Sequence, residues 1–532
     1  MRGRFLIGML LLAAAALALR LPRLALRPMH CDEANQAVLA GTLFDTGVYR
    51  YDPFEYHGPT MPWLAQPALW LYGTSDFAHS REQPYRLVPV AFSVGLILLL
   101  LAVGDGLGRA AALLAAALTA LSPALVFYGR CYIHETLLVF FTFAAIACGW
   151  RYFRSRSLAW AALTGASLGL MYSTKETWIL AAAAMAAGLV LTAACHGRDA
   201  GATPTNTGET PAPPRRTTRA IFTAALTAVL VAVACYSSFG TNWRGPLDSL
   251  LTYTIYWRRG SQAGIHTHPW YYYLQLLFAY RGARGFFWSE GLIGVLAVIG
   301  CGVGLTGRGI APQQRPLLRF LAIYTLVLTV LYGAIPYKTP WCLLSFLHGM
   351  ILLGGVGAWA ALRAAKRLPL RIAVALLLAA GLAHLGWQSY LLNFRFYAEG
   401  RNPWVYAATS PDVRNLAREI ERIAAAAPNE QEMTIHVVTP DNYWPLPWYL
   451  RQFRPGQVGY WQDAAAWAED SRRCPPPAVL ILTADVQPVV DRALRASYNK
   501  QMIFGLRPGV LVTVYVREDL WRSRQSAGGS RQ

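Results

Sequence analysis

The feature that most constrains this fold is a series of long apolar segments. Each is roughly 16 to 22 residues long, the length that a helix needs to cross a bilayer core of about 30 Å. Only 14% of the 532 residues are charged, whereas a soluble domain carries about a quarter. The sequence therefore predicts an α-helical polytopic membrane protein. We expect about eleven spans, near residues 5–20, 84–104, 109–128, 133–150, 157–172, 176–195, 218–238, 286–306, 317–335, 341–361 and 371–390.

The basic residues indicate an orientation. A net charge of +20 would suggest nucleic acid in a soluble protein, but here Lys and Arg collect in the short loops between alternate spans, as the positive-inside rule requires. We expect no nucleic-acid partner. The N-terminus is predicted on the cytoplasmic side of a cell (inner) membrane, and an odd number of spans places the C-terminus outside. The basic loop residues are Arg109, Arg151, Arg154, Arg156, Arg198, Arg215, Arg216, Arg219, Arg308, Arg315, Arg319, Arg363, Lys366, Arg367 and Arg371.

Hydrophilic stretches divide the chain into two predicted domains. Residues 1–390 form the transmembrane domain, and 391–532 form a small extracytoplasmic α/β domain. Segment 5–20 has the basic start and apolar run of a signal peptide, but it lacks a clear cleavage site, so an uncleaved helix is favoured. The long loops and the soluble elements are predicted at fixed places: outer loops at 21–83 and 239–285, an inner Pro- and Thr-rich linker at 196–217, helices at 411–426 and 486–497, and strands at 433–439, 478–484 and 509–516.

Three cations stand at predicted outer span ends, where the topology does not explain them: Arg130, Lys175 and Lys338. An ionisable group at such a depth is usually functional or paired. The structural alternative is a local ion pair, Arg130 with Glu135 or Lys175 with Glu176. Because all three cations are predicted on one side, a shared anionic ligand is the favoured interpretation.

The first outer loop carries two adjacent carboxylates, Asp32 and Glu33. They either start a helix that runs to about Leu43, since carboxylates stabilise helix N-termini, or belong to a site. The second outer loop contains His266 and His268, which could ligate a divalent cation (Mg, Mn or Zn). Their Trp and Tyr neighbours equally suit the interfacial belt of a membrane protein.

The order of these motifs resembles the GT-C superfamily of membrane glycosyltransferases, in particular its protein O-mannosyltransferase-like and aminoarabinose-transferase-like branches. The resemblance covers about residues 1–350. The later Lys338-Thr339-Pro340-Trp341 and the run from Tyr443 to Tyr449 look like a subfamily of archaeal surface-glycosylation clusters, some of whose members are labelled flippase-associated. The marks of the superfamily, in chain order, are Asp32-Glu33, His57-Gly58-Pro59, Arg130 to Glu135, Thr174-Lys175 and His268-Pro269-Trp270-Tyr271-Tyr272.

The resemblance implies transfer of a sugar from a polyprenyl-phosphate lipid to a protein, lipid or glycan acceptor on the extracytoplasmic side, with inversion at C1. It implies that Asp32 is the base for the acceptor hydroxyl and that Glu33 supports it or binds metal. The departing phosphate needs cations. The implied phosphate-binding residues are Arg130, Lys175 and Lys338, with Arg258 and Arg259 as weaker candidates, and His134, Glu135 and His57 have supporting roles.

The sequence departs from this pattern at one place and leaves three other readings open, one of which is a glycan polymerase or ligase that uses the same class of lipid donor. Gly58-Pro59-Thr60 stands where related enzymes often have Lys-Pro-Pro, so one phosphate-binding lysine is missing. A flippase or transporter of lipid-linked sugars would place charge at mid-bilayer, and the charges here crowd the span ends, which favours an enzyme. A non-catalytic partner in an envelope glycosylation complex is the remaining alternative.

Overall fold

The computed structural model describes residues 2–54, 57–201, 214–260, 266–282, 287–427 and 433–529. The chain divides into two compact units, each of which is treated by itself. Unit 1 consists of Met1–Leu24, Thr46–Ala68 and Gln83–Tyr406, and unit 2 consists of Ala25–Asp45, Leu69–Glu82 and Ala407–Gln532.

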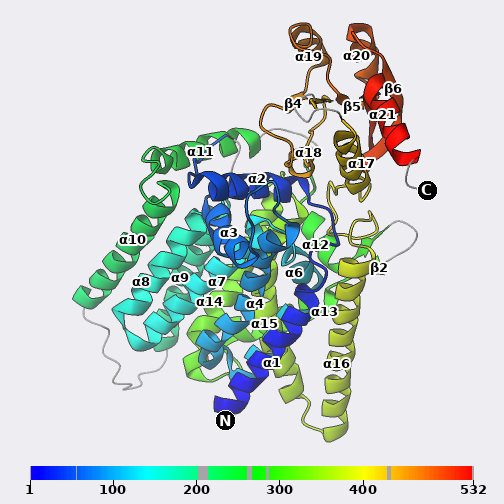
Figure 1. The fold of residues 1–532 in the computed structure, drawn as a ribbon. Helices are drawn as coiled ribbons and strands as arrows, with labels where there is room; N and C mark the ends of the chain where they lie inside the picture. Colours follow the sequence, from blue (N-terminus) through cyan, green and yellow to red (C-terminus); the bar gives the residue numbers. More distant parts are fainter. Residues whose placement is uncertain are drawn as a thin grey trace. The chain divides into compact units, whose positions relative to one another are not determined.

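Unit 1 is a bundle of helices (Figure 1). Its helices are α1 (Arg2–Arg20), α3 (Thr60–Leu71), α4 (Glu82–Leu107), α5 (Arg109–Leu121), α6 (Pro123–Tyr128), α7 (His134–Ser155), α8 (Leu158–Tyr172), α9 (Trp178–Gly201), α10 (Pro214–Tyr236), α11 (Gly245–Gly260), α12 (Tyr272–Phe278), α13 (Gly291–Thr306), α14 (Arg315–Ala334), α15 (Leu344–Ala364) and α16 (Leu368–Tyr390). Short 3-10 turns at Pro312–Gln314 and Pro340–Leu343 precede α14 and α15, a π-helical turn at Leu391–Arg395 ends α16, and β1 (Tyr280–Arg281) pairs with β2 (Phe287–Trp288).

The predicted membrane-spanning helices are present. Among the described residues, eight helices are long and apolar enough to cross a bilayer, and shorter apolar helices at Arg109–Leu121, Leu158–Tyr172 and Gly291–Thr306 fall on the three remaining predicted spans. The prediction of one helix over 109–128 is wrong, because Pro123 begins a separate helix, α6, after a break at Ser122. A proline is tolerated in the first turn of a helix but not in its interior.

Small residues set how closely the bundle packs. A Cβ added to Gly300 of α13 would lie 1.9 Å from the carbonyl oxygen of Leu353 in α15, and one added to Gly357 of α15 would lie 1.9 Å from that of Leu296 in α13. Neither position can hold a larger residue without moving the backbone. Glycines at such contacts let two membrane helices approach each other closely.

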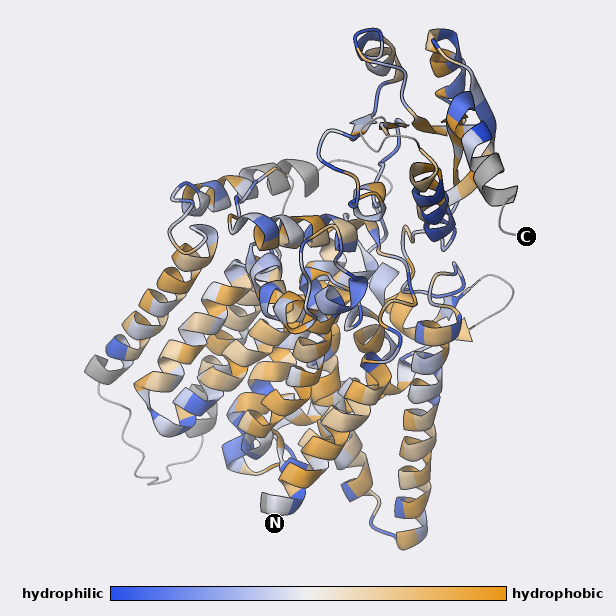
Figure 2. Ribbon diagram, viewed as in Figure 1, coloured by the Kyte–Doolittle hydropathy of each residue, from blue (hydrophilic) through white to orange (hydrophobic). Residues whose placement is uncertain are grey.

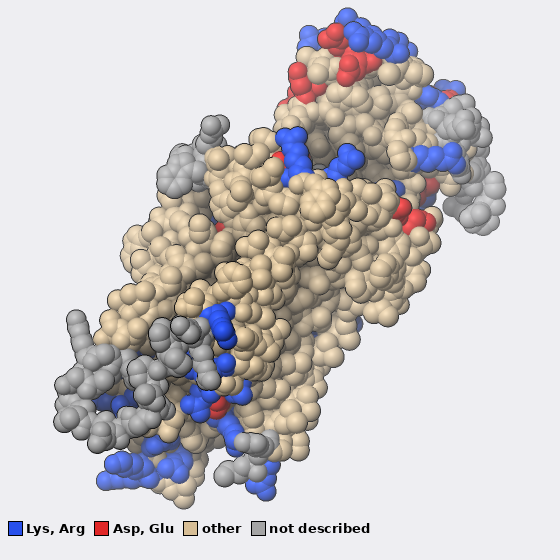
Figure 3. Space-filling model, turned by 90° about the vertical axis from the view of Figure 1, so that its left-hand side faces the viewer, with Lys and Arg blue, Asp and Glu red and all other residues tan. Residues whose placement is uncertain are grey.

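The surface of unit 1 fits a bilayer environment. Apolar residues cover most of the bundle in Figure 2, and in Figure 3 Lys and Arg gather at one of its ends, with few charged residues along its length. Helices α10 and α16 expose large apolar side chains, among them Phe222, Leu230 and Leu377. In a soluble protein such a surface would aggregate, so the chain is an integral membrane protein.

Unit 2 combines a small sheet with helices. The sheet has the strand order β4-β3-β5-β7-β6, with β3 parallel to β4 and β5, and β7 antiparallel to β5 and β6. The central strand, β5, reads VLILT and is buried throughout, as expected for a strand covered on both faces. The elements are α2 (Cys31–Thr46), α17 (Val413–Ala425), β3 (Ile435–Val438), α18 (Leu446–Tyr449), β4 (Val458–Trp461), α19 (Ala464–Asp470), β5 (Val479–Thr483), α20 (Gln487–Ala493), β6 (Tyr498–Arg507), β7 (Val510–Arg517) and α21 (Glu518–Gly529).

The predicted α/β domain at the C-terminus is confirmed, but its boundaries differ from the prediction. The predicted strands correspond to β3, β5 and β7, whereas β4 and β6 were not predicted. The unit begins at Ala407 rather than at residue 391, because residues 391–406 pack with the end of α16 in unit 1. It also includes two segments of the predicted outer loop 21–83, namely 25–45 and 69–82. The predicted linker 196–217 is helical at both ends, and residues 202–213 lie outside the described part.

Candidate functional site

A buried ion pair between Lys175 and Glu135 lies at the centre of the polar residues in unit 1. Glu135 is in the first turn of α7, and Lys175 is in the loop between α8 and α9. The Nζ of Lys175 donates to Oε1 of Glu135, and their side chains are 8% and 4% exposed. Burial lowers the pKa of Lys175, but the charge of Glu135 outweighs it and holds that pKa above its usual value. Lys175 is therefore charged in the folded protein.

A second buried carboxylate pairs with a histidine beside them. Oε2 of Glu176 lies 2.8 Å from Nδ1 of His57. Burial raises the pKa of Glu176, but the charge of His57 and its hydrogen bond lower that pKa by a larger amount. The pKa of Glu176 therefore lies below its usual value. The ring of His57 also meets that of His134 edge to face at 5.0 Å, and Nε2 of His134 is buried without a hydrogen-bond partner among the described residues.

The segment around Gly58 lies directly against the Lys175 loop. A Cβ at Gly58 would lie 2.1 Å from the carbonyl oxygen of Ser173, so no larger residue fits. The amide of Thr60 donates to that same oxygen over 3.2 Å, and its hydroxyl lies 3.0 Å from that of Thr174. Close contact with the Lys175 loop thus requires glycine at position 58 and leaves no room there for a lysine.

Lys338 and the two predicted metal-binding histidines lie on paired segments. Thr267 and Tyr337 form an antiparallel bridge, and the amide of Lys338 donates to the carbonyl oxygen of His266 over 2.9 Å. The ammonium of Lys338 contacts the carbonyl oxygen of Ile335 and donates to that of His268 over 3.2 Å. Burial lowers its pKa. The structure thus places Lys338 beside His266 and His268, which the sequence analysis assigns to two separate roles.

The histidines themselves contact aromatic residues. Nδ1 of His266 lies 2.5 Å from the hydroxyl of Tyr406, and the ring of His268 stacks on that of Tyr272 at 4.0 Å. Within the described ranges, no group of three or more His, Cys, Asp or Glu is placed to hold a metal ion. A metal at His266 and His268 remains a prediction.

Arg130 occupies the end of α1. Its Nη1 donates to the carbonyl oxygens of Leu19 and Arg20 over 3.2 and 2.8 Å, and its Nη2 donates to that of Arg23 over 3.3 Å. The guanidinium also lies 4.6 Å from the ring centre of Phe394. Carbonyl groups at a helix C-terminus are short of donors and carry partial negative charge. Arg130 therefore caps α1 and ties it to the end of α16.

Arg258 and Arg259 are in the last turn of α11, and their side chains lie outside the described part of the chain. The part of α11 that is described buries polar residues: the hydroxyl of Thr252 lies 2.6 Å from that of Tyr51, and the hydroxyl of Ser249 lies 2.7 Å from that of Tyr172. The helix thus turns its polar face to the bundle.

The acidic pair begins α2 in unit 2, and its two carboxylates have different environments. Glu33 is fully buried, where its Oε2 accepts from the amide of His30 over 3.0 Å and from Arg27 over 3.3 Å. The side chain of Asp32 is 53% exposed, and its Oδ2 lies 4.0 Å from Nδ1 of His30. Glu33 holds the start of the helix, whereas Asp32 is accessible to another molecule.

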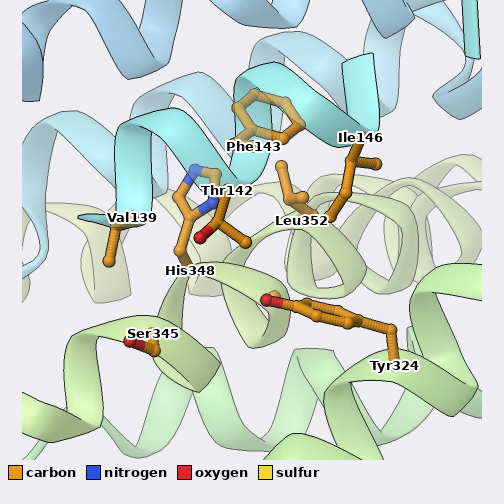
Figure 4. A pocket seen from close by; sticks show the side chains of 9 residues that line it. Val139, Thr142, Phe143, Ile146, Tyr324, Ser345, His348 and Leu352 are labelled. Atoms are coloured by element: carbon orange, nitrogen blue, oxygen red, sulfur yellow. The ribbon is translucent and has the colours of Figure 1, made fainter. Parts of the chain in front are cut away.

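A small cavity lies inside the bundle between α7, α14 and α15 (Figure 4). Its lining is partly polar, with Thr142, Ser345 and His348, and Nε2 of His348 is buried without a partner among the described residues. It is the size of about one water molecule, too small for a sugar. Its volume and polar lining would suit a single water molecule.

Two residues of the Lys175 cluster have partners that the sequence does not indicate. The sequence offers Glu176 as a local partner of Lys175, the alternative to a shared anionic ligand, but its carboxylate lies 2.8 Å from Nδ1 of His57. Cys342 is not among the predicted site residues, yet its Sγ lies 3.2 Å from the hydroxyl of Thr339, and its thiol lies near Lys175 and Glu135. The only signal in the sequence was its position four residues after Lys338.

Comparisons with known proteins agree with this architecture. Residues 63–198 match the family model described as dolichyl-phosphate-mannose-protein mannosyltransferase. No curated protein matches the sequence. ArnT from Cupriavidus metallidurans bound to undecaprenyl phosphate has a TM-score of 0.64 and 17% identity, over 95% of this chain and 97% of ArnT. Apo ArnT has a TM-score of 0.63 and 16% identity over the same shares. These likenesses confirm the resemblance drawn from the motifs at the level of the fold: the chain is a membrane protein with the same fold as ArnT.

Proposed function

We propose that this protein is a glycosyltransferase that moves a sugar from a polyprenyl-phosphate lipid to a protein, lipid or glycan acceptor on the extracytoplasmic side of the membrane. The observation that carries the proposal is the difference between the two carboxylates at the start of α2. Glu33 is buried and paired with Arg27, while the side chain of Asp32 is 53% exposed. An accessible carboxylate next to a rigid anchor is what a general base requires.

In this mechanism Asp32 takes the proton from the acceptor hydroxyl as its oxygen attacks C1 of the sugar. The bond between C1 and the phosphate oxygen breaks, and its electron pair leaves with the lipid phosphate. A single displacement of this kind inverts the configuration at C1. The acceptor gains the sugar, and the polyprenyl phosphate is released.

The departing phosphate needs positive charge nearby. We assign this role to Lys175 and Lys338, since burial makes a charge more effective by lowering the local dielectric constant. Two of the three ammonium hydrogens of Lys338 face the carbonyl oxygens of Ile335 and His268, and among the contacts of the described residues the third is available to a ligand. Lys175 is oriented by Glu135. Arg130 has a weaker claim, because its guanidinium caps α1.

ArnT, bound to undecaprenyl phosphate, has the same fold, which supports a polyprenyl lipid as the donor. The size of the sugar and the acceptor class are open within this proposal. The orientation rests on the basic loops, which the positive-inside rule assigns to the cytoplasm.

The test uses the full chain in proteoliposomes with a labelled polyprenyl-phosphate sugar. Asp32→Asn keeps the shape of the side chain but removes the base, so transfer should fall at least about 100-fold with unchanged protein level. Asp485→Asn, another exposed aspartate of unit 2, is the control and should transfer normally. Undiminished transfer by Asp32→Asn would remove Asp32 from the role of base.

A further inference from the structure

The backbone just before Asp32 is held by side chains from the C-terminal part of unit 2. The guanidinium of Arg414, in the first turn of α17, donates to the carbonyl oxygens of Ala25, Leu26 and Arg27 over 2.6, 3.1 and 3.0 Å. It also pairs with Glu82 at 3.4 Å. One arginine therefore fixes three successive peptide groups of a segment that has no regular structure.

Three further contacts continue this hold up to the start of α2. The hydroxyl of Thr409 donates to the carbonyl oxygen of Met29 over 2.6 Å, and the amide of Met29 donates to the hydroxyl of Tyr449 over 3.0 Å. The thiol of Cys31 lies 3.3 Å from the carbonyl oxygen of Trp444. Thr409, Met29, Tyr449 and Cys31 are all buried, so water does not compete for these bonds.

The contacts converge on a short piece of chain. Met29 is held at both its amide and its carbonyl group, and Cys31 is held by its side chain, so the backbone is fixed on the side that leads into Asp32. On the other side, Glu33 is buried against Arg27. Asp32 itself stays exposed. Its position is determined while its carboxylate remains accessible.

A fixed backbone beside an exposed carboxylate is important for a residue that acts as a general base. Loops that carry functional residues are otherwise mobile, and a displacement of about 1 Å can cost about 100-fold in rate. The Tyr-Trp-Pro-Leu-Pro-Trp-Tyr run at 443–449, which the proposed mechanism does not use, supplies two of the contacts to this segment.

We propose that the C-terminal part of unit 2 acts as a clamp that positions Asp32, and that Arg414, Thr409 and Tyr449 are its positioning residues. The clamp consists of these three side chains and their contacts with residues 25–29. Its catalytic consequence rests on the proposed function, in which Asp32 is the base, but the clamp can be detected without any activity measurement.

The detection uses the thiol of Cys31. Burial and the neighbouring charge of Asp32 raise its pKa to about 11, so alkylation in the native protein is slow. In the full chain, Tyr449→Phe removes one hydroxyl and Thr409→Val replaces a hydroxyl with a methyl group. Both should speed alkylation of Cys31 about tenfold, measured on the Cys31 peptide by mass spectrometry, because each removes one of the two bonds that hold Met29.

The matched controls keep the same elements. Thr409→Ser retains the hydroxyl and should alkylate Cys31 at the wild-type rate. Arg418→Gln changes an exposed arginine of α17 that bonds only within its own helix in the described contacts, and it should also behave as wild type. Arg414→Gln should have the largest effect. If it fails to fold, Tyr449→Phe and Thr409→Val still decide the question.

The kinetic readout separates positioning from mere stability. In proteoliposomes, Tyr449→Phe and Thr409→Val should lower kcat of transfer about 10- to 100-fold with little change in the KM for the lipid donor, and Thr409→Ser should restore kcat. Wild-type alkylation rates in both variants would overturn the clamp. Faster alkylation with wild-type kcat would overturn its role in positioning Asp32. Absence of transfer by the wild-type protein would overturn the proposed function and leave the alkylation result standing.

Discussion

Lys175 and Glu135 lie 40 positions apart in the sequence and meet in a buried ion pair. Charge alone singled out both residues, because neither suits a predicted span end. Their partners could not be predicted, and the local pairs Lys175 with Glu176 and Arg130 with Glu135 were the only ones that sequence proximity offered. The actual pairs depend on how the loops pack, which the local sequence does not encode. The same holds for His57 and Glu176.

A double-variant experiment separates the structural role of this pair from its functional role. Lys175→Met leaves a buried carboxylate unpaired and should lower stability by about 3–5 kcal/mol. The double variant Lys175→Met with Glu135→Gln removes both charges and should recover most of that loss. Transfer should stay impaired in both, because the phosphate loses Lys175. Thermal unfolding in detergent and the transfer assay measure the two effects. Normal transfer by the stable double variant would exclude Lys175 from phosphate binding.

The His57–Glu176 pair predicts a pH dependence of stability. The pKa of Glu176 in the folded protein lies below its usual value of 4.5, so its contribution to stability is present above that value and is lost as the pH falls through the lower, folded pKa. The difference in melting temperature between wild type and Glu176→Gln should therefore be constant from pH 7 to about 5 and shrink below that. A difference that grows on acidification would contradict the pairing.

At the scale of elements, α11 reverses the usual pattern of an amphipathic helix. Asp248, Ser249 and Thr252 are buried, whereas Leu247, Leu250 and Leu251 are exposed. Helix α10, which precedes α11 in the chain, also exposes large apolar residues. A helix with this arrangement lies in a membrane interface. The sequence analysis places these residues in the outer loop 239–285 without a helix, and which face of the helix is buried depends on the tyrosines of the bundle.

We therefore expect α11 to place its leucines in lipid. An environment-sensitive fluorophore attached to Leu250→Cys should emit at a short wavelength in proteoliposomes, as in an apolar medium. The same probe at Arg244→Cys, whose side chain is 81% exposed, should report more water. Water-like emission at both positions would contradict the interfacial placement of α11.

In the sheet of unit 2, His436 of β3 gives a second pH dependence. Its Nδ1 accepts from Nε1 of Trp467 over 3.0 Å, and burial lowers its pKa to about 4. The unfolded chain takes up a proton below about pH 6.5 and the folded chain does not. The free energy of unfolding of this unit should therefore be highest above about pH 6.5 and should decrease as the pH falls from about 6.5 to about 4. Trp fluorescence should follow this loss, and His436→Gln should be much less sensitive over that window.

At the scale of the whole molecule, the apolar pattern was enough to predict a helical membrane protein with an α/β region at its C-terminus. The division into units was not, because residues 25–45 and 69–82 fold with residues beyond 406. Apolar periodicity reports which residues are buried but not which distant segment buries them. The strands β4 and β6 escaped prediction for a related reason: the four residues of β4 are only partly buried, and β6 contains irregular pairing.

The central claim is that the protein breaks the bond between a sugar and a polyprenyl phosphate. The direct measurement follows the lipid in proteoliposomes that contain the wild-type protein, a polyprenyl-phosphate sugar and an acceptor. We predict release of free polyprenyl phosphate in equal amount to a glycosylated product of inverted anomeric configuration, with both lost in Asp32→Asn. Recovery of the intact lipid-linked sugar, moved unchanged to the other leaflet, would contradict this account and identify a flippase.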